Sequence, residues 1–311
     1  MNVAQLLRAS AVMVGLTLWA TASAQQQSSD DRYKEVHVAS GRFSLGDPAP
    51  SWVDIAAIPD TANSQPVVVR LADTQPLVGD IPTLSYRRAT LINDPASLTD
   101  AGRFSISFAP EYQRVKLHSI YLHRGGVKLD RTTTSTIRFL QREQDLEYGV
   151  YDGLVAASVL VDDLRVGDTL EYAYSLQGQN PVFNGKYVSL ASWDQGYPAL
   201  LRRVTLNHPV SRKISWRMIG DRSFPSVVPK ETIHGDVRKL EFEGRPIPEI
   251  ESEPQTPRDY FPYRFLQFSE FAVGVKSQTG PMDYFKPTGL LAMKSKRLQT
   301  KSARTTMSSD K

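Results

Sequence analysis

The sequence has no cysteine among its 311 residues. A thiolate is the nucleophile of cysteine hydrolases and a common ligand of zinc, so a cysteine nucleophile, a disulfide framework and a cysteine-bound metal are excluded. A chain of this length can bury enough apolar surface to fold without disulfides. Its apolar content of 41% and aromatic content of 9% are those of a globular protein.

Helical periodicity is also lacking. Between Gln25 and Glu270, no stretch of 12 or more residues repeats apolar side chains at the helical spacing. Apolar and polar residues instead alternate at the period of a β-strand. The alternating segments are Phe104–Phe108, Val115–Tyr121, Thr169–Leu176, Val204–Leu206, Ile214–Met218 and Leu240–Phe242. In the third segment, a core face is predicted for Leu170, Tyr172, Tyr174 and Leu176, and a solvent face for Thr169, Glu171, Ala173 and Ser175.

Turn signals separate these strands. They are Gly125-Gly126, Tyr151-Asp152-Gly153, Gly167-Asp168, Asn207-His208-Pro209 and Gly220-Asp221. Many short strands with frequent turns indicate an all-β fold, namely an antiparallel β-sandwich that is either one large sandwich or two packed sandwiches.

Long apolar runs are absent except near the N-terminus. There, Arg8 precedes the run Ala11–Ala20, whose length of about ten residues is too short to span a bilayer. The small residues Ala22-Ser23-Ala24 then form a cleavage signature before Gln25. We therefore expect residues 1–24 to be a cleaved signal peptide, and the protein to be periplasmic or secreted with no integral membrane segment after cleavage.

Composition divides the rest of the chain into three segments. Residues 25–245 form the predicted β-sandwich module. Residues 246–271 form an extended, proline-rich connector, whose first part cannot be a regular helix or a central strand because of Pro246, Pro248, Pro254, Pro257 and Pro262. Residues 272–311 form a basic tail that we expect to be disordered. The abrupt change at Ala272 also allows the interpretation that the tail is a frameshifted or truncated reading frame.

The excess of basic residues is confined to that tail. Residues 272–311 hold eight Lys or Arg and two Asp, and so contribute six net positive charges to a chain whose total is +4. The remainder of the chain is therefore net acidic. This distribution argues against a basic binding face and against nucleic acid as a partner.

Histidines and carboxylates do not have the spacing of a metal or catalytic site. The histidines are His37, His118, His123, His208 and His234, for which surface positions are favoured. His118 and His123 are five residues apart on a predicted strand, which places them on opposite faces. The carboxylate pairs Glu143 with Asp145 and Asp162 with Asp163 are local, and the second is predicted to be a turn cluster. We therefore predict no catalytic, cofactor-binding or metal-binding residue, and no cofactor.

Other motifs point to structure rather than chemistry. The sequence has no nucleophile elbow, P-loop or calcium loop. Basic residues lie near aromatic residues at Lys186, Arg202, Arg203, Arg212 and Lys213, with Tyr187, Trp193 and Trp216. On strands, these residues could form a sugar or polyanion platform, but outward charges alternating along a sheet explain them more simply.

A series of short motifs occurs in order between about Val115 and Pro209. They are Ile137-Arg138 through Arg142-Glu143, Asp145–Tyr148, Tyr151-Asp152-Gly153, Val161–Asp168, Leu170–Tyr174, Gly178–Phe183, Trp193, and Arg203 ahead of His208-Pro209. Their order and spacing resemble the N-terminal domain of unknown function that precedes the transglutaminase-like core in exported bacterial proteins. The resemblance implies a β-sandwich followed, after Leu266–Phe271, by a core with a Cys, His and Asp site. The chain has no cysteine, and only 40 residues follow Phe271. This core is therefore expected to be missing, and no catalytic residue is carried over.

These observations favour an exported, non-catalytic β-sandwich module over an enzyme. Its expected partner is a protein or a cell-envelope polymer. Two alternatives stay open, namely a hydrolase that uses carboxylates on the sandwich and a truncated relic without independent function. A concave strip of aromatic and acidic side chains would favour the hydrolase, whereas an exposed apolar patch would favour the module or the relic.

Overall fold

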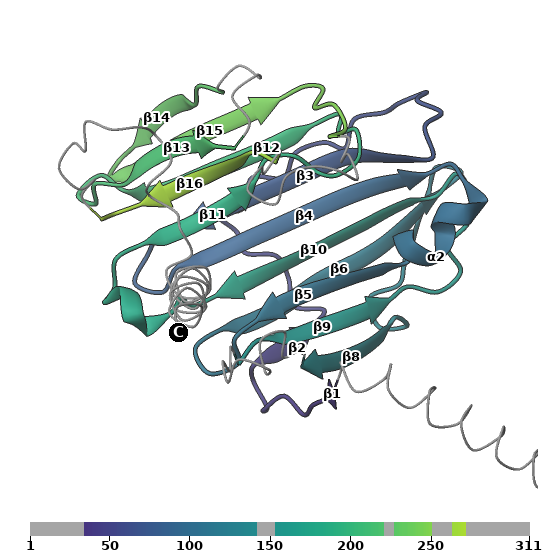
Figure 1. Ribbon diagram of the computed structural model, residues 1–311, viewed down its shortest axis with the longest axis horizontal. Helices are drawn as coiled ribbons and strands as arrows, with labels where there is room; N and C mark the ends of the chain where they lie inside the picture. Colours follow the sequence, from purple (N-terminus) through teal and green to yellow (C-terminus); the bar gives the residue numbers. More distant parts are fainter. Residues whose placement is uncertain (1–33, 142–152, 221–226, 251–262, 272–311) are drawn as a thin grey trace, which may run out of the picture. The chain divides into compact units, whose positions relative to one another are not determined.

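A computed structural model of the chain describes residues 34–141, 153–220, 227–250 and 263–271. All of them belong to one compact unit, residues 1–271. They form mostly β-strands arranged in three sheets (Figure 1), which confirms the all-β prediction. The predicted signal peptide and the predicted tail lie outside the described residues.

The largest sheet has nine strands. In spatial order they are β14 (Lys230–His234), β15 (Val237–Gly244), β12 (Arg202–Pro209), β3 (Val67–Leu77), β4 (Thr83–Ile92), β10 (Thr169–Gln177), β6 (Arg114–Arg124) and β2 (Phe43–Leu45), with β7 (Val127–Asp130) paired to β6. Its neighbouring strands are antiparallel, except that β12 runs parallel to β3 and β2 runs parallel to β6. The sandwich is therefore mixed and not purely antiparallel.

Two smaller sheets accompany it. The four-stranded sheet has the order β1 (Lys34–Glu35), β8 (Thr136–Gln141), β9 (Val155–Leu160) and β5 (Arg103–Phe108), and the three-stranded sheet has the order β11 (Val188–Ser192), β16 (Phe265–Ser269) and β13 (Ser215–Ile219). Among the described residues, the helices are single turns, namely η1 (Pro95–Ser97), α2 (Leu98–Ala101) and η3 (Pro181–Phe183). In the described part of the chain, no helix has the length and apolarity needed to cross a membrane.

Both small sheets pack against the same face of the nine-stranded sheet, side by side (Figure 1). Ala72 of β3 belongs to the core beneath the three-stranded sheet, and Tyr172 of β10 packs into the core beneath the four-stranded sheet. Both residues lie directly opposite Arg88 of the intervening β4. Residues directly opposite across neighbouring strands share a face, so one face of the large sheet supports both cores.

The two cores are built from the apolar members of the alternating strands. Beneath the three-stranded sheet, Phe242 makes edge-to-face contacts with Trp216 and Phe268, at ring-centroid distances of 4.9 and 5.9 Å. Beneath the four-stranded sheet, Ile120 and Leu170 of the large sheet pack in one cluster with residues of β5 and β9. Burial of each such side chain contributes about 1.5–3 kcal/mol, so these two layers hold the sheets together.

The opposite face of the nine-stranded sheet is covered by the extended segment 47–60. Its Ala56 and Ile58 pack on a small apolar cluster that contains Leu71 of β3. Its Asp54 exchanges hydrogen bonds with the side chain of Gln75, with the backbone N–H donating at 3.0 Å and the backbone carbonyl accepting at 2.6 Å. This segment excludes solvent from a face that the alternation alone would leave exposed.

Both faces of strand β10 are therefore largely buried. Leu170 and its alternating partners pack against the core beneath the four-stranded sheet, which confirms the predicted core face. The predicted solvent face is wrong, because Glu171 is 3% exposed and Ser175 is fully buried. Covering by the segment 47–60 makes both faces of this strand interior.

Two further sequence predictions are corrected by the ladders. Asn207-His208-Pro209 is the last part of β12 and not a turn, since His208 pairs with Arg238 and Pro209 stands at the final ladder position, where a missing N–H is tolerated. Phe265–Ser269, placed in the connector, forms β16, the central strand of the three-stranded sheet. It can do so because the last proline of the connector is Pro262, so every residue of β16 keeps its backbone N–H.

Candidate binding site

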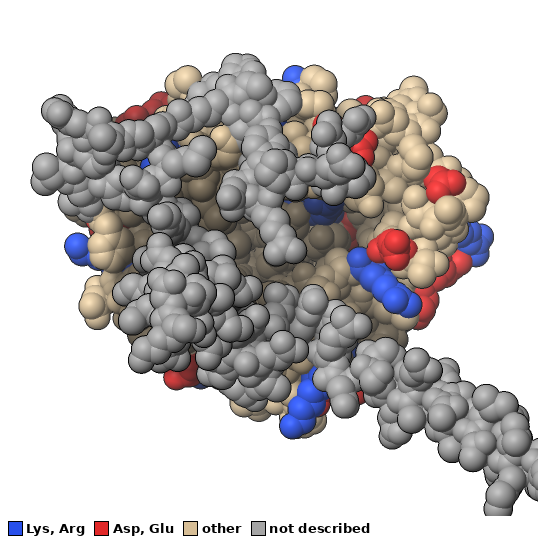
Figure 2. All heavy atoms as spheres, viewed as in Figure 1, with Lys and Arg blue, Asp and Glu red and all other residues tan. Residues whose placement is uncertain are grey.

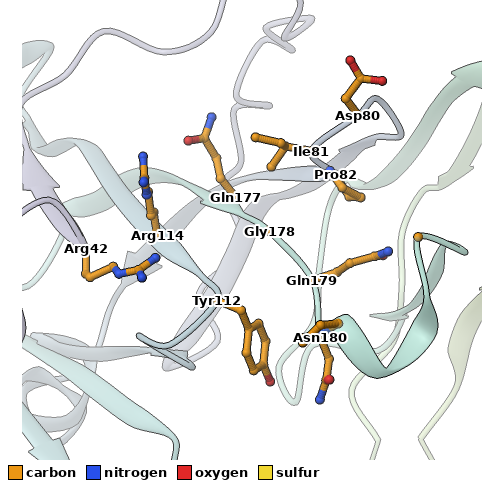
Figure 3. A pocket seen from close by; sticks show the side chains of 12 residues that line it. Arg42, Asp80, Ile81, Pro82, Tyr112, Arg114, Gln177, Gly178, Gln179 and Asn180 are labelled. Atoms are coloured by element: carbon orange, nitrogen blue, oxygen red, sulfur yellow. The ribbon is translucent and has the colours of Figure 1, made fainter.

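A pocket of about 420 Å³ opens where β10 ends (Figure 3). Three chain segments surround it, namely the β3–β4 turn with Asp80 to Pro82, the β5–β6 turn with Tyr112, and the end of β10 with the residues after it, from Gln177 to Pro181. Arg42, just before β2, and Arg114, the first residue of β6, complete one side.

Gly178 allows these segments to meet. Its φ of +100° lies in the region that favours glycine, and a Cβ here would lie 2.2 Å from the carbonyl oxygen of Tyr112. The N–H of Gly178 donates to the carbonyl of Pro82 at 2.9 Å, which ties the exit of β10 to the β3–β4 turn. Only glycine at this position brings the β5–β6 turn into the pocket wall.

The two residues after Gly178, Gln179 and Asn180, are held in place as well. The Asn180 carboxamide oxygen accepts a hydrogen bond from the N–H of Val182 at 3.0 Å and caps η3. The Gln179 carboxamide nitrogen donates to the carbonyl of Lys186 at 3.2 Å. The oxygen of the same carboxamide is buried without a hydrogen-bond partner in the described structure.

The polar part of the lining includes two guanidiniums, several carboxamides and one carboxylate. Figure 3 shows the guanidinium groups of Arg42 and Arg114 on one side of the pocket and Asp80 on the other, with Gln177 between them. Arg42 donates to the carbonyl of Glu111 at 3.0 Å, whereas Arg114 is exposed and has no ion-pair partner within the described ranges. Two guanidiniums and several carboxamides suit a ligand that carries carboxylates or other polar oxygen atoms.

A second hollow of about 220 Å³ shares Pro82, Tyr112 and the stretch 178–180 with the pocket. It is more apolar at its far end, where Leu84 of β4 and Leu176 of β10 form part of its lining. The two hollows thus form one groove with a cationic end and an apolar end.

A strip of tyrosines leads from the apolar end along the core-side face of β4 and β10. The Tyr86 ring lies 5.2 Å from the Tyr174 ring and 6.1 Å from the Tyr172 ring, and Tyr172 stacks on Phe104 at 3.9 Å. Burial raises the pKa of Tyr172 and Tyr174, so both phenols stay protonated at neutral pH. Arg88 and Arg202 are charged neighbours of Tyr86, and both are cations. Among the described residues, the strip is therefore not the aromatic and acidic one expected of a carboxylate hydrolase.

The opposite face of the sheet holds a buried polar network. A bulge in β6 shifts its register against β10, so His118 and His123 lie on the same face and not on opposite faces as predicted. His123 Nε2 lies 2.6 Å from Oε2 of Glu171. Arg87 donates to the other carboxylate oxygen, Oε1, at 2.7 Å. Burial works to raise the pKa of Glu171, but the Arg87 guanidinium and the other donors outweigh it and lower that pKa.

A serine–histidine pair belongs to this network. His118 Nδ1 lies 2.8 Å from the carbonyl of Asp47 and must donate to it, which leaves Nε2 to accept from the Ser175 hydroxyl at 2.7 Å. Burial lowers the pKa of His118 and favours the neutral ring. Ser175 has no exposed surface, so a substrate cannot reach its hydroxyl, and the pair serves the fold.

The remaining histidines are scattered. His37 and His234 are exposed, as predicted, whereas His118 and His208 are buried, which contradicts the predicted surface positions. In the residues that the structure describes, no group of three or more His, Asp or Glu is placed to hold a metal ion.

The carboxylate pairs are not brought together into a site. Asp163 lies in a turn with a φ of +58° and contacts Arg124, Arg131 and Arg165, as a turn cluster does. Glu143 and Asp145 lie outside the described residues.

The basic residues near aromatic residues were predicted to be outward charges alternating along a sheet, and this prediction is wrong in part. Arg202 is 1% exposed and donates to the carbonyl of Ser192 at 3.0 Å, and Arg203 is 6% exposed and pairs with Asp73 at 2.7 Å. Trp193 is fully buried. These side chains are therefore interior and form neither outward charges nor a platform.

Charges on the visible face of the molecule do not gather by sign. Figure 2 shows basic and acidic side chains of the described residues interspersed around uncharged surface. The groove residues were missed from the sequence because they come from four distant segments. Gly178 within Gly178–Phe183 was the available signal, since a glycine directly after a strand marks a turn or a close backbone approach.

Comparisons with known proteins agree with this architecture. The model of a family named as a domain of unknown function, DUF3857, matches residues 83–251, which is more than half of the chain. A crystal structure described as a "putative protease" from Parabacteroides distasonis aligns with a TM-score of 0.58 and 15% identity, and it therefore shows the fold alone. The alignment covers 67% of this chain and 41% of that chain. No curated protein matches the sequence.

Proposed function

The chain belongs to the DUF3857 family, and we propose that it is an exported, non-catalytic β-sandwich module that binds a protein or a cell-envelope polymer through the groove at the end of β10. The observation that carries this proposal is the lining of the groove. Its cationic end offers guanidinium and carboxamide donors beside a single carboxylate, Asp80. Binding needs such donors, whereas acid–base hydrolysis needs a second carboxylate or a nucleophile with its base.

The buried serine–histidine pair supports the same proposal. Ser175 and His118 have the hydrogen bond of a nucleophile and its base, but the serine has no exposed surface. A nucleophile must reach the atom that it attacks, so a fully buried hydroxyl is a poor candidate.

Export and domain context complete the proposal. Residues 1–24 have the charge, apolar run and small-residue signature of a signal peptide, which supports a periplasmic or secreted location. The alignment covers 41% of the Parabacteroides chain, so that chain extends well beyond the shared part. An accessory module beside a further domain, such as the transglutaminase-like core, would account for that proportion.

The test is capture of partners from cell-envelope extract with residues 25–311 as bait. The Arg42→Ala, Arg114→Ala double variant should lose the captured partner, because it removes both guanidiniums of the groove. Arg138→Ala is the matched control, since Arg138 is an exposed arginine of β8 in the four-stranded sheet.

Three results would contradict the proposal. Capture that is equal for all three baits would place the binding surface elsewhere. Release of soluble fragments from envelope polymers by the purified bait would favour the hydrolase. Capture of nothing by any bait would favour the relic.

A further inference from the structure

Strand β11 forms one edge of the three-stranded sheet. It pairs with β16 on one side, and no other described strand pairs with it. Just outside this ladder, the N–H of Glu270 donates to the carbonyl of Tyr187, and the N–H of Trp193 donates to the carbonyl of Arg264. Tyr187 and Trp193, and every second residue between them, therefore direct their backbone groups toward β16.

The intervening residues direct their backbone groups to the open side. These are Val188, Leu190 and Ser192. The Ser192 carbonyl confirms the direction, because it accepts from the guanidinium of Arg202, which lies outside this sheet. Val188 and Leu190 thus present two N–H groups and two carbonyls, at a spacing of two residues, along an edge to which no described strand pairs.

This open edge borders the groove. Val188 and Ser189 line the second hollow, opposite Leu84 and Leu176 on the large sheet. The main pocket begins at the N-terminal end of the same strand, where Gly185 forms part of its lining. A chain lying along the edge of β11 would therefore pass over apolar surface and reach the cationic end.

We infer that the ligand of the groove is an extended peptide segment that adds to β11 as an antiparallel strand and places its C-terminal carboxylate between Arg42 and Arg114. This inference rests on the proposed function and names its ligand. An antiparallel partner runs from Ser192 toward Val188, so its C-terminus points to the main pocket. Main-chain hydrogen bonds supply affinity in this mode of recognition, and pockets for alternate side chains supply specificity.

The backbone edge favours a peptide over an acidic polysaccharide. Its donors and acceptors recur with the spacing of a second peptide strand, about 6.6–6.8 Å for two residues. A sugar chain has no reason to match that repeat. Both ligands would use the guanidiniums, so the arginines alone do not distinguish them.

The experiment uses residues 25–311 and three probes. The first is a fluorescein-labelled octapeptide library, built from Val, Leu, Phe, Ser and Gly, with free α-carboxylates. The second is the same library with α-carboxamides, and the third is labelled polygalacturonate. Fluorescence anisotropy should show binding of the free-acid library that exceeds binding of the amidated library by about tenfold, as loss of one charge-assisted contact implies.

Two matched pairs of variants locate the ligand. Leu190→Pro removes the N–H on the open edge and keeps the ladder to β16, and should weaken free-acid binding by about fivefold or more, whereas Leu190→Ala should keep it. Arg114→Ala should abolish the preference for the free acid, whereas Arg138→Ala should leave it. Thermal melting tests whether each variant keeps the fold. If Leu190→Pro unfolds, the comparison of Arg114→Ala with Arg138→Ala still tests the carboxylate contact.

The outcomes separate this inference from the proposed function. Equal binding of both libraries would overturn the carboxylate contact. Loss of binding in Leu190→Ala as large as in Leu190→Pro would overturn strand addition to β11. Binding of polygalacturonate that depends on Arg114, without binding of either library, would overturn the peptide mode and keep the binding module. Binding of no probe, together with partner capture that ignores the groove arginines, would overturn both.

Discussion

The Glu171 carboxylate accepts a 2.7 Å hydrogen bond from Arg87 across the β10–β4 ladder. The two residues lie on the face covered by the segment 47–60, and Glu171 is 3% exposed there. Arg87 also donates to the carbonyl of Ala56, which ties the covering segment to the sheet. This pair therefore joins two layers of the fold.

Removal of the Glu171 charge should destabilise the protein strongly. Glu171→Gln leaves the Arg87 guanidinium without its buried counter-charge, so we expect a loss of about 3–5 kcal/mol in the free energy of unfolding. Urea melts measure this loss. Glu231→Gln is the control, because the exposed pair of Glu231 with Arg238 should contribute less than about 1 kcal/mol. Equal losses in the two variants would contradict the buried position of Glu171.

Tyr172 should contribute through its ring. Tyr172→Ala removes the stack on Phe104 and should cost about 3 kcal/mol, since it combines lost burial with a lost aromatic contact. The same melts apply, with Tyr197→Ala as control because Tyr197 is 43% exposed. A loss at Tyr172 no larger than that at Tyr197 would show that the strip is not packed.

Gly178→Ala should damage both stability and the groove. The new methyl group would meet the carbonyl of Tyr112 at a position where φ is +100°, so we expect a loss of about 2 kcal/mol or more. Gly46→Ala tests backbone conformation alone, because Gly46 has a φ of +79° and no atom within 4 Å of a new Cβ. That control should lose about 1–2 kcal/mol. Thermal and urea melts compare the two, and a smaller loss at Gly178 would contradict the close approach.

Acid should destabilise the fold in two stages. Burial lowers the pKa of His118 and His208, so the unfolded chain takes up protons more readily near pH 6.5, and stability falls as the pH drops through that value. Hydrogen bonds from Arg165 and Arg124 lower the pKa of Asp163 to about 2, so a second loss begins below about pH 4. Urea melts at intervals between about pH 8 and pH 3 should show both stages. Constant stability between about pH 7.5 and 5.5 would refute the neutral buried histidines.

Export predicts a defined mature start. Cleavage after Ala24 should leave Gln25 as the first residue of periplasmic or secreted material. Determination of the N-terminal sequence of that fraction measures this directly. An intact start at Met1 in the exported fraction would mean that the segment is an uncleaved anchor.

Local alternation in the sequence sufficed to predict the strands. A period of two follows from the geometry of an extended chain, so segments such as Leu240–Phe242 were recognisable without knowledge of their partners. The core face of β10 was also recognisable, because Tyr172 and Tyr174 are large and apolar. The glycines at Gly125-Gly126 likewise marked the β6–β7 turn, where both have positive φ.

Tertiary structure decided what lies against each face. Glu171 became interior because a segment more than 100 residues away crosses its face, and His118 joined the face of His123 because one bulge reverses the parity of alternation. The groove also depends on tertiary structure, because Arg42, Tyr112 and Gly178 meet only when β2, β6 and β10 lie together. Period and turn chemistry are properties of neighbours in sequence, whereas burial and site geometry depend on which distant segments pack together.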